Sequence, residues 1–190
     1  MFTLDAFQKT LDKLIAVLSK YQVRFHLTGG ITSSIYGIPR MTQDVDLVID
    51  NEATTRHMAE ICSELEVLGY LVNRESISKS LENKSMFQLY DTHESLKLDV
   101  YPRELIAGEL SRSVEVELFP GMAYPVVSLE DAAISKLVWV NLGSHKSRSD
   151  IKSIFRSANE QQQVRIRELA EEAGLASLLD EILTTPDEIR

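Results

Sequence analysis

The residues most able to do chemistry are two aspartates in the segment Asp44-Val-Asp46-Leu-Val-Ile49. Apolar and polar residues alternate here as in a strand, where alternate side chains share a face. Both carboxylates therefore point the same way, roughly 6 to 7 Å apart along the backbone. Hard cations such as Mg²⁺ are commonly held by one or two carboxylates together with substrate phosphates. The pair is a candidate metal site, and the alternative is two polar residues on a half-buried strand.

Two glycines, Gly29 and Gly30, precede the aspartates at the junction between an alternating strand pattern over residues 23–27 and a short helix. Glycines at such a junction let backbone N–H groups approach a phosphate closely, and the N-terminus of the following helix favours negative charge. We expect a phosphate loop beside the metal carboxylates. Ser33 and Ser34 could add hydroxyl contacts to phosphate, or they could be ordinary serines on the helix surface.

The elements that position these residues follow from periodicity and turn residues. The expected helices cover residues 4–18, 31–36, 52–68 and, after residue 128, about 129–142, 147–158, 161–173 and 175–183. The expected strands cover residues 23–27, 44–49, 70–72, 86–90, 95–101, 114–119 and 122–127. This order predicts an α/β (α+β) fold with a small mixed β-sheet flanked by helices. It divides the chain into an α/β core, 1–127, and a C-terminal helical segment, 128–190, packed on the core.

At this point the sequence resembles a known superfamily. Leu27-Thr-Gly-Gly30, thirteen intervening residues and then Asp44-Val-Asp-Leu47 are similar to the signature of the DNA polymerase β-like nucleotidyltransferases. The resemblance implies that the two aspartates hold Mg²⁺, or Mn²⁺ in its place, against a nucleoside triphosphate. It also implies a third carboxylate from a later strand. Many active relatives have Ser where this chain has Gly30, which removes one hydroxyl contact to phosphate.

Asp99 is the candidate for that third carboxylate. In Leu96-Lys-Leu-Asp-Val-Tyr101, apolar residues alternate with a face that carries Asp99, after a plausible hairpin. Asp91 and Glu94 are poorer candidates because they fall in the predicted turn. In the superfamily this group completes metal binding or helps to remove the acceptor proton, as a general base does. The alternative is a solvent-facing aspartate on a strand.

The closer resemblance is to a compact bacterial branch that includes the abortive-infection (AbiEii-type) toxin nucleotidyltransferases. In that branch an Arg lies between the glycines and the aspartates, and Arg40 matches it, so Arg40 could neutralise phosphate charge or pair with an acidic neighbour. That branch also has a later helical Lys and a downstream Arg/Lys-x-x-Asp segment, to which Lys136 and Arg148-Ser-Asp150-Ile-Lys152 are similar. The resemblance implies that Lys136 reaches the triphosphate and that Asp150 orients Lys136 or a neighbouring basic group. These two residues lie in the most basic region of the chain, which includes His145, Lys146, Arg148, Lys152 and Arg156. This region could bind a polyanion or could be a solvated helix face.

The overall composition restricts the classes of partner. With 20 basic and 29 acidic residues, the formal net charge is −9, whereas broad capture of nucleic acid normally needs a basic face. A tRNA acceptor would need a local basic patch. The single cysteine, Cys62, cannot form an internal disulfide, and the N-terminus lacks the layout of a secretion signal. The apolar runs are shorter than the roughly 18 residues that a membrane-spanning helix needs. We therefore expect a cytoplasmic protein with no membrane partner.

Two functions remain open at this stage. The first is an enzyme that transfers a nucleoside monophosphate from a nucleoside triphosphate to an acceptor hydroxyl on tRNA, a protein or a small molecule. The second is a catalytically degenerate domain that binds a nucleotide or a partner protein, such as a cognate antitoxin. A sugar-nucleotide glycosyltransferase fits poorly, because those enzymes usually have a nucleotide-binding half well before such a motif and only 43 residues precede Asp44. Trp139 lies on an apolar helix stripe, which favours core packing over stacking on a nucleobase.

Overall fold

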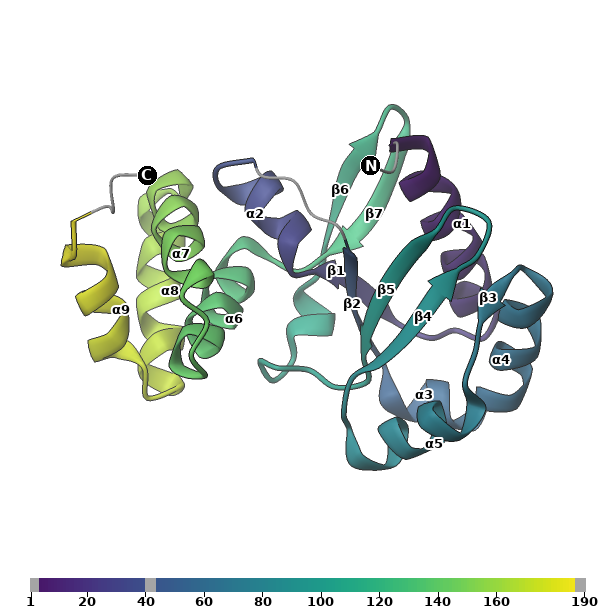
Figure 1. The fold of residues 1–190 in the computed structure, drawn as a ribbon. Helices are drawn as coiled ribbons and strands as arrows, with labels where there is room; N and C mark the ends of the chain where they lie inside the picture. Colours follow the sequence, from purple (N-terminus) through teal and green to yellow (C-terminus); the bar gives the residue numbers. More distant parts are fainter. Residues whose placement is uncertain (1–3, 40–43, 187–190) are drawn as a thin grey trace.

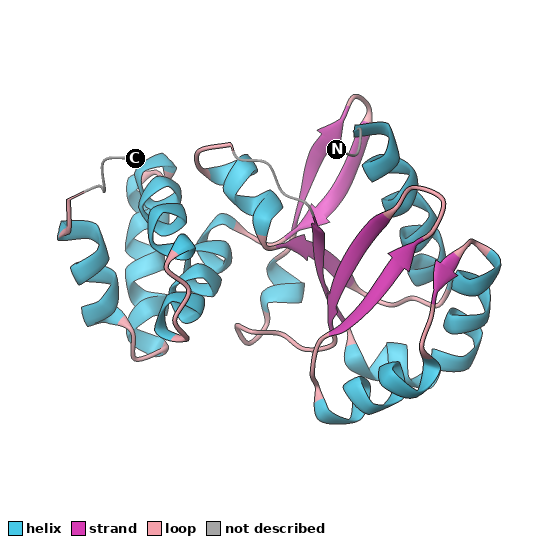
Figure 2. Cartoon of the chain, in the orientation of Figure 1, coloured by secondary structure: helices cyan, strands magenta, loops and turns pink. Residues whose placement is uncertain are grey.

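The computed structural model describes residues 4–39 and 44–186, which form a lobe built on a sheet and a lobe built from helices (Figure 1). The first lobe contains a seven-stranded mixed sheet with helices packed against it, and the last four helices make the second lobe (Figure 2). The predicted fold class is therefore confirmed.

The sheet has the strand order β3-β4-β5-β2-β1-β7-β6. Its strands are β1 (Phe25–Thr28), β2 (Asp44–Ile49), β3 (Tyr70–Leu71), β4 (Phe87–Asp91), β5 (Leu96–Tyr101), β6 (Val114–Phe119) and β7 (Met122–Val126). The two predicted hairpins are present as β4–β5 and β6–β7, both antiparallel. β1 runs antiparallel to β2, whereas β5 runs parallel to β2, so β2 lies between the strand that leads into the glycine loop and the strand that carries Asp99.

The helices of the described residues lie around this sheet and beside it. They are α1 (Leu4–Lys20), α2 (Gly30–Tyr36), α3 (Asn51–Arg56), α4 (Met58–Val67), α5 (Arg74–Asn83), the 3₁₀ helix η1 (Glu109–Arg112), α6 (Leu129–Asn141), α7 (Lys146–Ser157), α8 (Glu160–Glu172) and α9 (Ala176–Thr184). In Figure 1, α2 lies between the sheet and the C-terminal helices, and it packs against α6 and α7. The loop between β1 and β2 thus lies next to both lobes.

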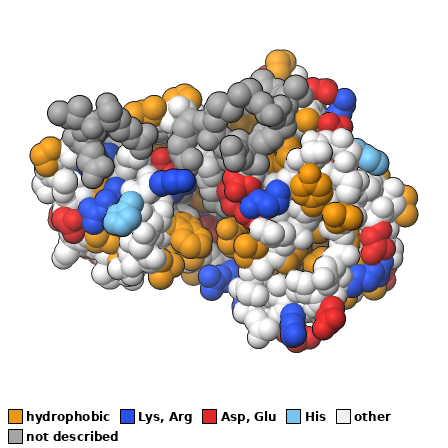
Figure 3. Space-filling model, in the orientation of Figure 1, with side chains coloured by type: hydrophobic (Ala, Val, Ile, Leu, Met, Phe, Trp, Pro, Cys, Tyr) orange, Lys and Arg blue, Asp and Glu red, His pale blue; other side chains and the backbone are white. Residues whose placement is uncertain are grey.

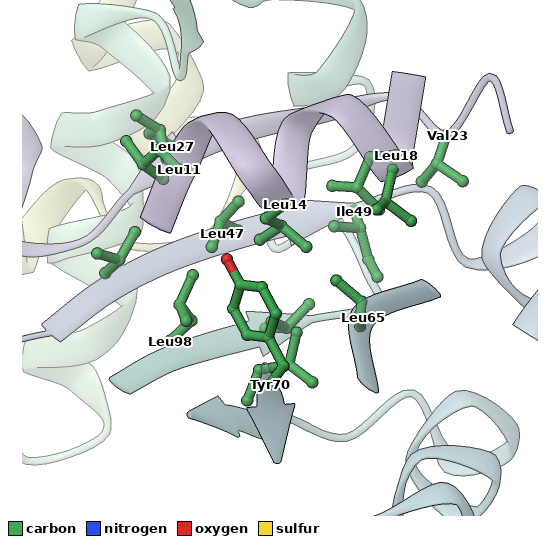
Figure 4. Close-up of a cluster of buried hydrophobic side chains, with 14 of the residues drawn as sticks. Leu11, Leu14, Leu18, Val23, Leu27, Leu47, Ile49, Leu65, Tyr70 and Leu98 are labelled. Atoms are coloured by element: carbon green, nitrogen blue, oxygen red, sulfur yellow. The ribbon is translucent and has the colours of Figure 1, made fainter. Parts of the chain in front are cut away.

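The apolar face of the sheet determines which way the aspartates point. The buried leucines of α1, including Leu14, pack near Leu47 of β2 and Leu98 of β5 (Figure 4). Along these two strands the leucines alternate with Asp46 and Asp99, so the carboxylates lie on the face away from α1. Burying each leucine side chain contributes about 1.5–3 kcal/mol. A flip of either strand would therefore lose core burial as well as the arrangement of the carboxylates.

The helical region after β2 differs from the prediction in two respects. The helix expected over residues 52–68 is interrupted at His57, whose φ of −115° and ψ of 18° leave the helical region, giving α3 and α4. The helix α5 was not predicted, because its core face has only Ile77 and Leu81 and its other residues are mostly polar. Its N-cap residue Asn73, which accepts a hydrogen bond from the Ser76 N–H, is the local signal that could have indicated it.

A second hydrophobic cluster holds the C-terminal helices together. It consists of buried residues of α6 to α9 with Ala158, including Leu137, Ile151, Ile166 and Ile182. Helix α6 joins the two clusters, since Ala132 belongs to the sheet cluster and the next residue, Ala133, to the helical one. The division of the chain after residue 127 stays a prediction. None of the helices within residues 4–39 and 44–186 combines the length and apolarity needed to cross a bilayer.

Candidate active site

The glycine loop and the aspartates come together because β1 and β2 are antiparallel neighbours. The register pairs Thr28, the last residue of β1, with Asp46, so the chain leaves the sheet beside that carboxylate. The Gly30 N–H donates a hydrogen bond to Asp46 Oδ2 at 3.4 Å. Gly29 has a φ of +68°, and a Cβ atom at Gly29 would lie 1.9 Å from Asp46 Oδ2. Only glycine fits at this position, because any side chain would occupy the place of the carboxylate.

Asp99 lies next to Asp46 because β2 and β5 are parallel and in register. The register pairs Asp46 with Asp99, and both side chains are on the same face of the sheet. Asp99 is largely buried, and its Oδ1 accepts a hydrogen bond from Gln88 Nε2 at 2.9 Å. The structure thus brings together the three predicted acidic residues: Asp44, Asp46 and Asp99.

Of the two acidic residues that the sequence placed in the β4–β5 turn, Asp91 lies in a strand instead. Asp91 is the last residue of β4, it is fully buried, and it pairs with Lys13 Nζ at 2.6 Å and accepts from Thr10 Oγ1 at 2.7 Å. It therefore fastens α1 to the sheet. Glu94 is in the turn as predicted.

Lys97 is a residue of the site that sequence reasoning missed. Its Nζ lies 3.0 Å from Asp99 Oδ2 and 3.6 Å from Asp44 Oδ2, so one ammonium group bridges two of the carboxylates. The signal was present in the sequence, because Lys97 shares a strand face with Asp99 two residues later. In the part of the chain that the structure describes, no three acidic, His or Cys side chains form a ready-made metal site. The oxygen donors suit Mg²⁺ in type, but Lys97 already compensates part of their charge.

The electrostatics at Asp46 show how crowded the negative charge is. Burial, followed by the charge of Asp44, raises the pKa of Asp46 to about 6; the Gly30 N–H and Lys136 oppose this rise, and Asp99 adds to it. The Tyr101 hydroxyl donates to Asp46 Oδ1 at 3.5 Å. An ionised Asp46 is therefore costly without additional positive charge.

Lys136 connects the helical lobe to the glycine loop. Its Nζ donates to the carbonyl oxygen of Gly29 at 2.9 Å and lies 3.4 Å from Asp150 Oδ2. Both Lys136 and Asp150 are buried. Asp150, on α7, therefore holds Lys136, on α6, against the loop. The roles expected of Lys136 and Asp150 toward a triphosphate stay predictions.

The remaining predicted site residues have mixed positions. Ser33 is fully buried, which rules out the surface position, and its Oγ finds no hydrogen-bond partner among the described residues. Its contact with phosphate stays a prediction. Ser34 is half-buried on the same helix. Arg40 lies outside the described residues.

The basic region of α7 is less open than a polyanion site requires. Lys152 is buried and donates to the carbonyl oxygens of Thr185 and Pro186, and Arg148 pairs with Glu181 at 2.9 Å. These two cations therefore connect α7 to α9 and to residues 185–186. This differs from the expectation because the partners come from α9 and the residues after it.

A pocket opens between the sheet and α6 beside Asp46. Its empty volume, which includes space open to solvent, is about 530 Å³.

 It is lined on the sheet side by Gly29, Asp46 and Tyr101, and on the helix side by Lys136 and Trp139. Figure 3 shows acidic and basic side chains next to each other near the boundary between the two lobes, with hydrophobic side chains nearby.

Trp139 does not lie in the core, contrary to the prediction. Its side chain is 39% exposed, and it lines the pocket beside Asp46. The apolar stripe that suggested core packing is buried only in part, since Ala132 and Ala133 are buried whereas Leu142 is exposed. Trp139 lies on the neighbouring side of α6, which faces the sheet lobe.

Several solved structures share the fold of this chain. The solution structure of the antibiotic-resistance factor ANT(2'')-Ia has a TM-score of 0.58 and 16% identity, and the match covers 94% of this chain and 98% of that one. The crystal structure of ANT(2'')-Ia in complex with adenylyl-2''-tobramycin has a TM-score of 0.55 and 15% identity, and the match covers 88% of this chain and 99% of that one. The lincomycin-bound lincosamide antibiotic adenylyltransferase LnuA has a TM-score of 0.52 and 18% identity, and the match covers 83% of this chain and 99% of that one. At these identities the likeness concerns the fold alone. No match was found among curated protein sequences.

The sequence model of one family covers most of the chain. It is described as nucleotidyl transferase AbiEii toxin, type IV TA system, and it matches residues 12–173. The match includes the glycine loop, the three aspartates, Lys136 and Asp150. This chain belongs to the AbiEii family of nucleotidyltransferase toxins.

Proposed function

We propose that this chain transfers a nucleoside monophosphate from a nucleoside triphosphate to an acceptor hydroxyl, with Mg²⁺ or Mn²⁺ as cofactor. The observation that carries the proposal is the convergence of Gly29, Asp46 and Lys136 on one pocket in a member of a nucleotidyltransferase family. In this reaction the acceptor oxygen bonds to the α-phosphorus. The bond from the α-phosphorus to its bridging oxygen breaks, and pyrophosphate leaves.

The residues of the site have distinct proposed roles. Asp44 and Asp46 would hold the divalent cation, which when bound would neutralise charge on the triphosphate. Lys136, held at the glycine loop by its bond to the Gly29 carbonyl oxygen, would attract the phosphates. Asp99 would supply the third carboxylate, either to the metal or to the acceptor proton, in competition with Lys97, which now pairs with it.

The acceptor is a hydroxyl of tRNA, of a protein or of a small molecule. Structures with the same fold include an enzyme named for adenylating lincosamide antibiotics, which makes a small-molecule acceptor one candidate. The toxin family match favours a macromolecular target and a cognate antitoxin as partner. The net charge of −9 favours a protein or a short nucleic-acid end over long nucleic acid.

The test is an incorporation assay with each of the four α-labelled triphosphates, offered total tRNA and a cell extract as acceptors. We expect label transfer that needs Mg²⁺ or Mn²⁺ and stops when EDTA is added. Asp44→Asn and Asp46→Asn should each abolish transfer. Asp5→Asn is the matched control, because Asp5 is an exposed aspartate on α1 whose pair with Lys9 is a surface contact of little energetic value. Transfer that persists in both site variants would contradict the metal role.

A second candidate function is supported by two observations at the same site. Gly30 replaces the serine found in many active relatives, and Asp99 is held by Lys97 and Gln88. Under this candidate the chain binds a metal-nucleotide complex or a partner protein without turnover. Calorimetry separates the two functions, because nucleotide binding without transfer to any acceptor in the screen would favour the second.

A further inference from the structure

We propose that Trp139 is the stacking surface for the nucleobase of the donor nucleotide. This inference rests on the proposed function, since it assigns a base-binding role to one wall of the same pocket. Trp139 is 39% exposed, although a buried tryptophan would bring a larger gain in apolar burial. Its exposed ring lines the pocket that also contains Asp46 and Gly29.

The position of Trp139 on α6 relates it to the phosphate end of the site. Ser135 and Trp139 are four residues apart, so they share a face of the helix, and both line the pocket with the adjacent Lys136. Lys136 reaches the glycine loop, where the phosphates would bind. A nucleotide with its phosphates at Lys136 would therefore have Trp139 within the same pocket for its base.

The rest of the pocket suits a planar group with polar edges. Val48, Tyr101 and Leu105 give it apolar surface, and Arg103 adds a cation from the segment after β5. Glu109 lines it too, and burial raises the pKa of this carboxyl to about 7. Aromatic side chains bind bases by stacking because every base has a π-face, so the expected ligand is a nucleobase rather than an aliphatic chain.

The exposed residue Leu142 allows a base-binding role of Trp139 to be distinguished from a role in docking a partner protein. Leu142, at the end of α6, is 66% exposed and does not line the pocket. A docking surface on this helix would include Leu142, whereas a base-binding wall would not. Leu142 therefore serves as the matched control position.

The experiment uses the fact that Trp139 is the only tryptophan of the chain, so intrinsic tryptophan fluorescence reports on this position alone. The full-length protein is titrated with each nucleoside triphosphate and Mg²⁺, and separately with inorganic tripolyphosphate, which has the phosphates but no base. We expect saturable quenching by at least one nucleoside triphosphate. Tripolyphosphate should reverse that quenching by competition and cause little change alone. Equal changes with tripolyphosphate and nucleotides would overturn the proposal.

Variants provide the second measurement. Trp139→Leu should raise the KM for the triphosphate roughly 5-fold to 150-fold, the range for loss of one base-stacking aromatic. We expect Trp139→Phe, which keeps an aromatic ring, to recover most of this loss, and Leu142→Ala to leave the KM unchanged. An unchanged KM in Trp139→Leu, or an effect of equal size in Leu142→Ala, would overturn the proposal and would favour a partner surface.

The outcomes also separate this inference from the proposed function. Label transfer without a base-dependent fluorescence change would refute stacking on Trp139 and leave the transferase activity intact. Base-dependent quenching without transfer to any acceptor would refute the transferase activity and support the binding-only candidate, with Trp139 still stacking on the base. If Trp139→Leu fails to fold, the wild-type titration and Trp139→Phe still decide the question.

Discussion

Replacing Asp46 with asparagine should stabilise the fold while abolishing nucleotide transfer. Burial and then the charge of Asp44 raise the pKa of Asp46 from 3.8 to about 6, so its ionised form destabilises the folded state. At 1.36 kcal/mol per pH unit the full effect is about 3 kcal/mol, and solvent screening of a partly exposed carboxylate reduces the expected gain to about 1–2 kcal/mol. Asparagine has nearly the same shape and can still accept the Gly30 N–H hydrogen bond.

The sign of the pH dependence gives the sharpest test. Below about pH 4 Asp46 is protonated in both the folded and unfolded states, so Asp46→Asn should have little effect. As the pH rises through about 6, the folded wild-type protein loses the stability of its neutral carboxyl, and the advantage of the variant should reach its maximum. Urea denaturation from pH 4 to 8 in the presence of EDTA measures this difference.

Asp50→Asn is a control of opposite sign. Burial would raise the pKa of Asp50, but the hydrogen bond from the Ala53 N–H and the contact with Arg24 outweigh burial and lower it. Its ionised form therefore stabilises the fold above its unfolded pKa, and this contribution is lost as the pH falls. Asp50→Asn should weaken the fold at neutral pH. A destabilised Asp46→Asn, or a gain that does not change with pH, would refute the reasoning about the crowded carboxylates.

Two further predictions concern the glycine loop and its link to α6. Gly29→Ala should cost more than about 2 kcal/mol in urea denaturation and abolish transfer, because its Cβ would lie 1.9 Å from Asp46 Oδ2. Gly121 also has a positive φ but has open space around it, so Gly121→Ala should cost only about 1–2 kcal/mol. Similar losses of stability in the two variants would contradict the steric reason. Lys136→Met breaks a buried ion pair with Asp150, so a loss of about 3–5 kcal/mol is expected together with loss of transfer. A loss of less than about 1 kcal/mol would show that the pair contributes little to the docking of α6.

Features that depend on neighbouring residues could be predicted from the sequence. The orientation of Asp44 and Asp46 on one strand face follows from the two-residue period of a strand. The turn at Gly29-Gly30 follows from the backbone freedom of glycine. The apolar stripe of α1 follows from the helix period, and buried leucines confirm it. These elements needed no knowledge of what packs against them.

Other features became visible only in the tertiary structure, because they depend on how distant segments pair and pack. The parallel register of β2 with β5 places Asp99 beside Asp46, and it places Lys97 between the carboxylates. The docking of α6 on the sheet lobe brings Lys136 to Gly29 and turns Trp139 toward the pocket. Strand register and helix docking are set by the burial of a shared core, which no local pattern encodes.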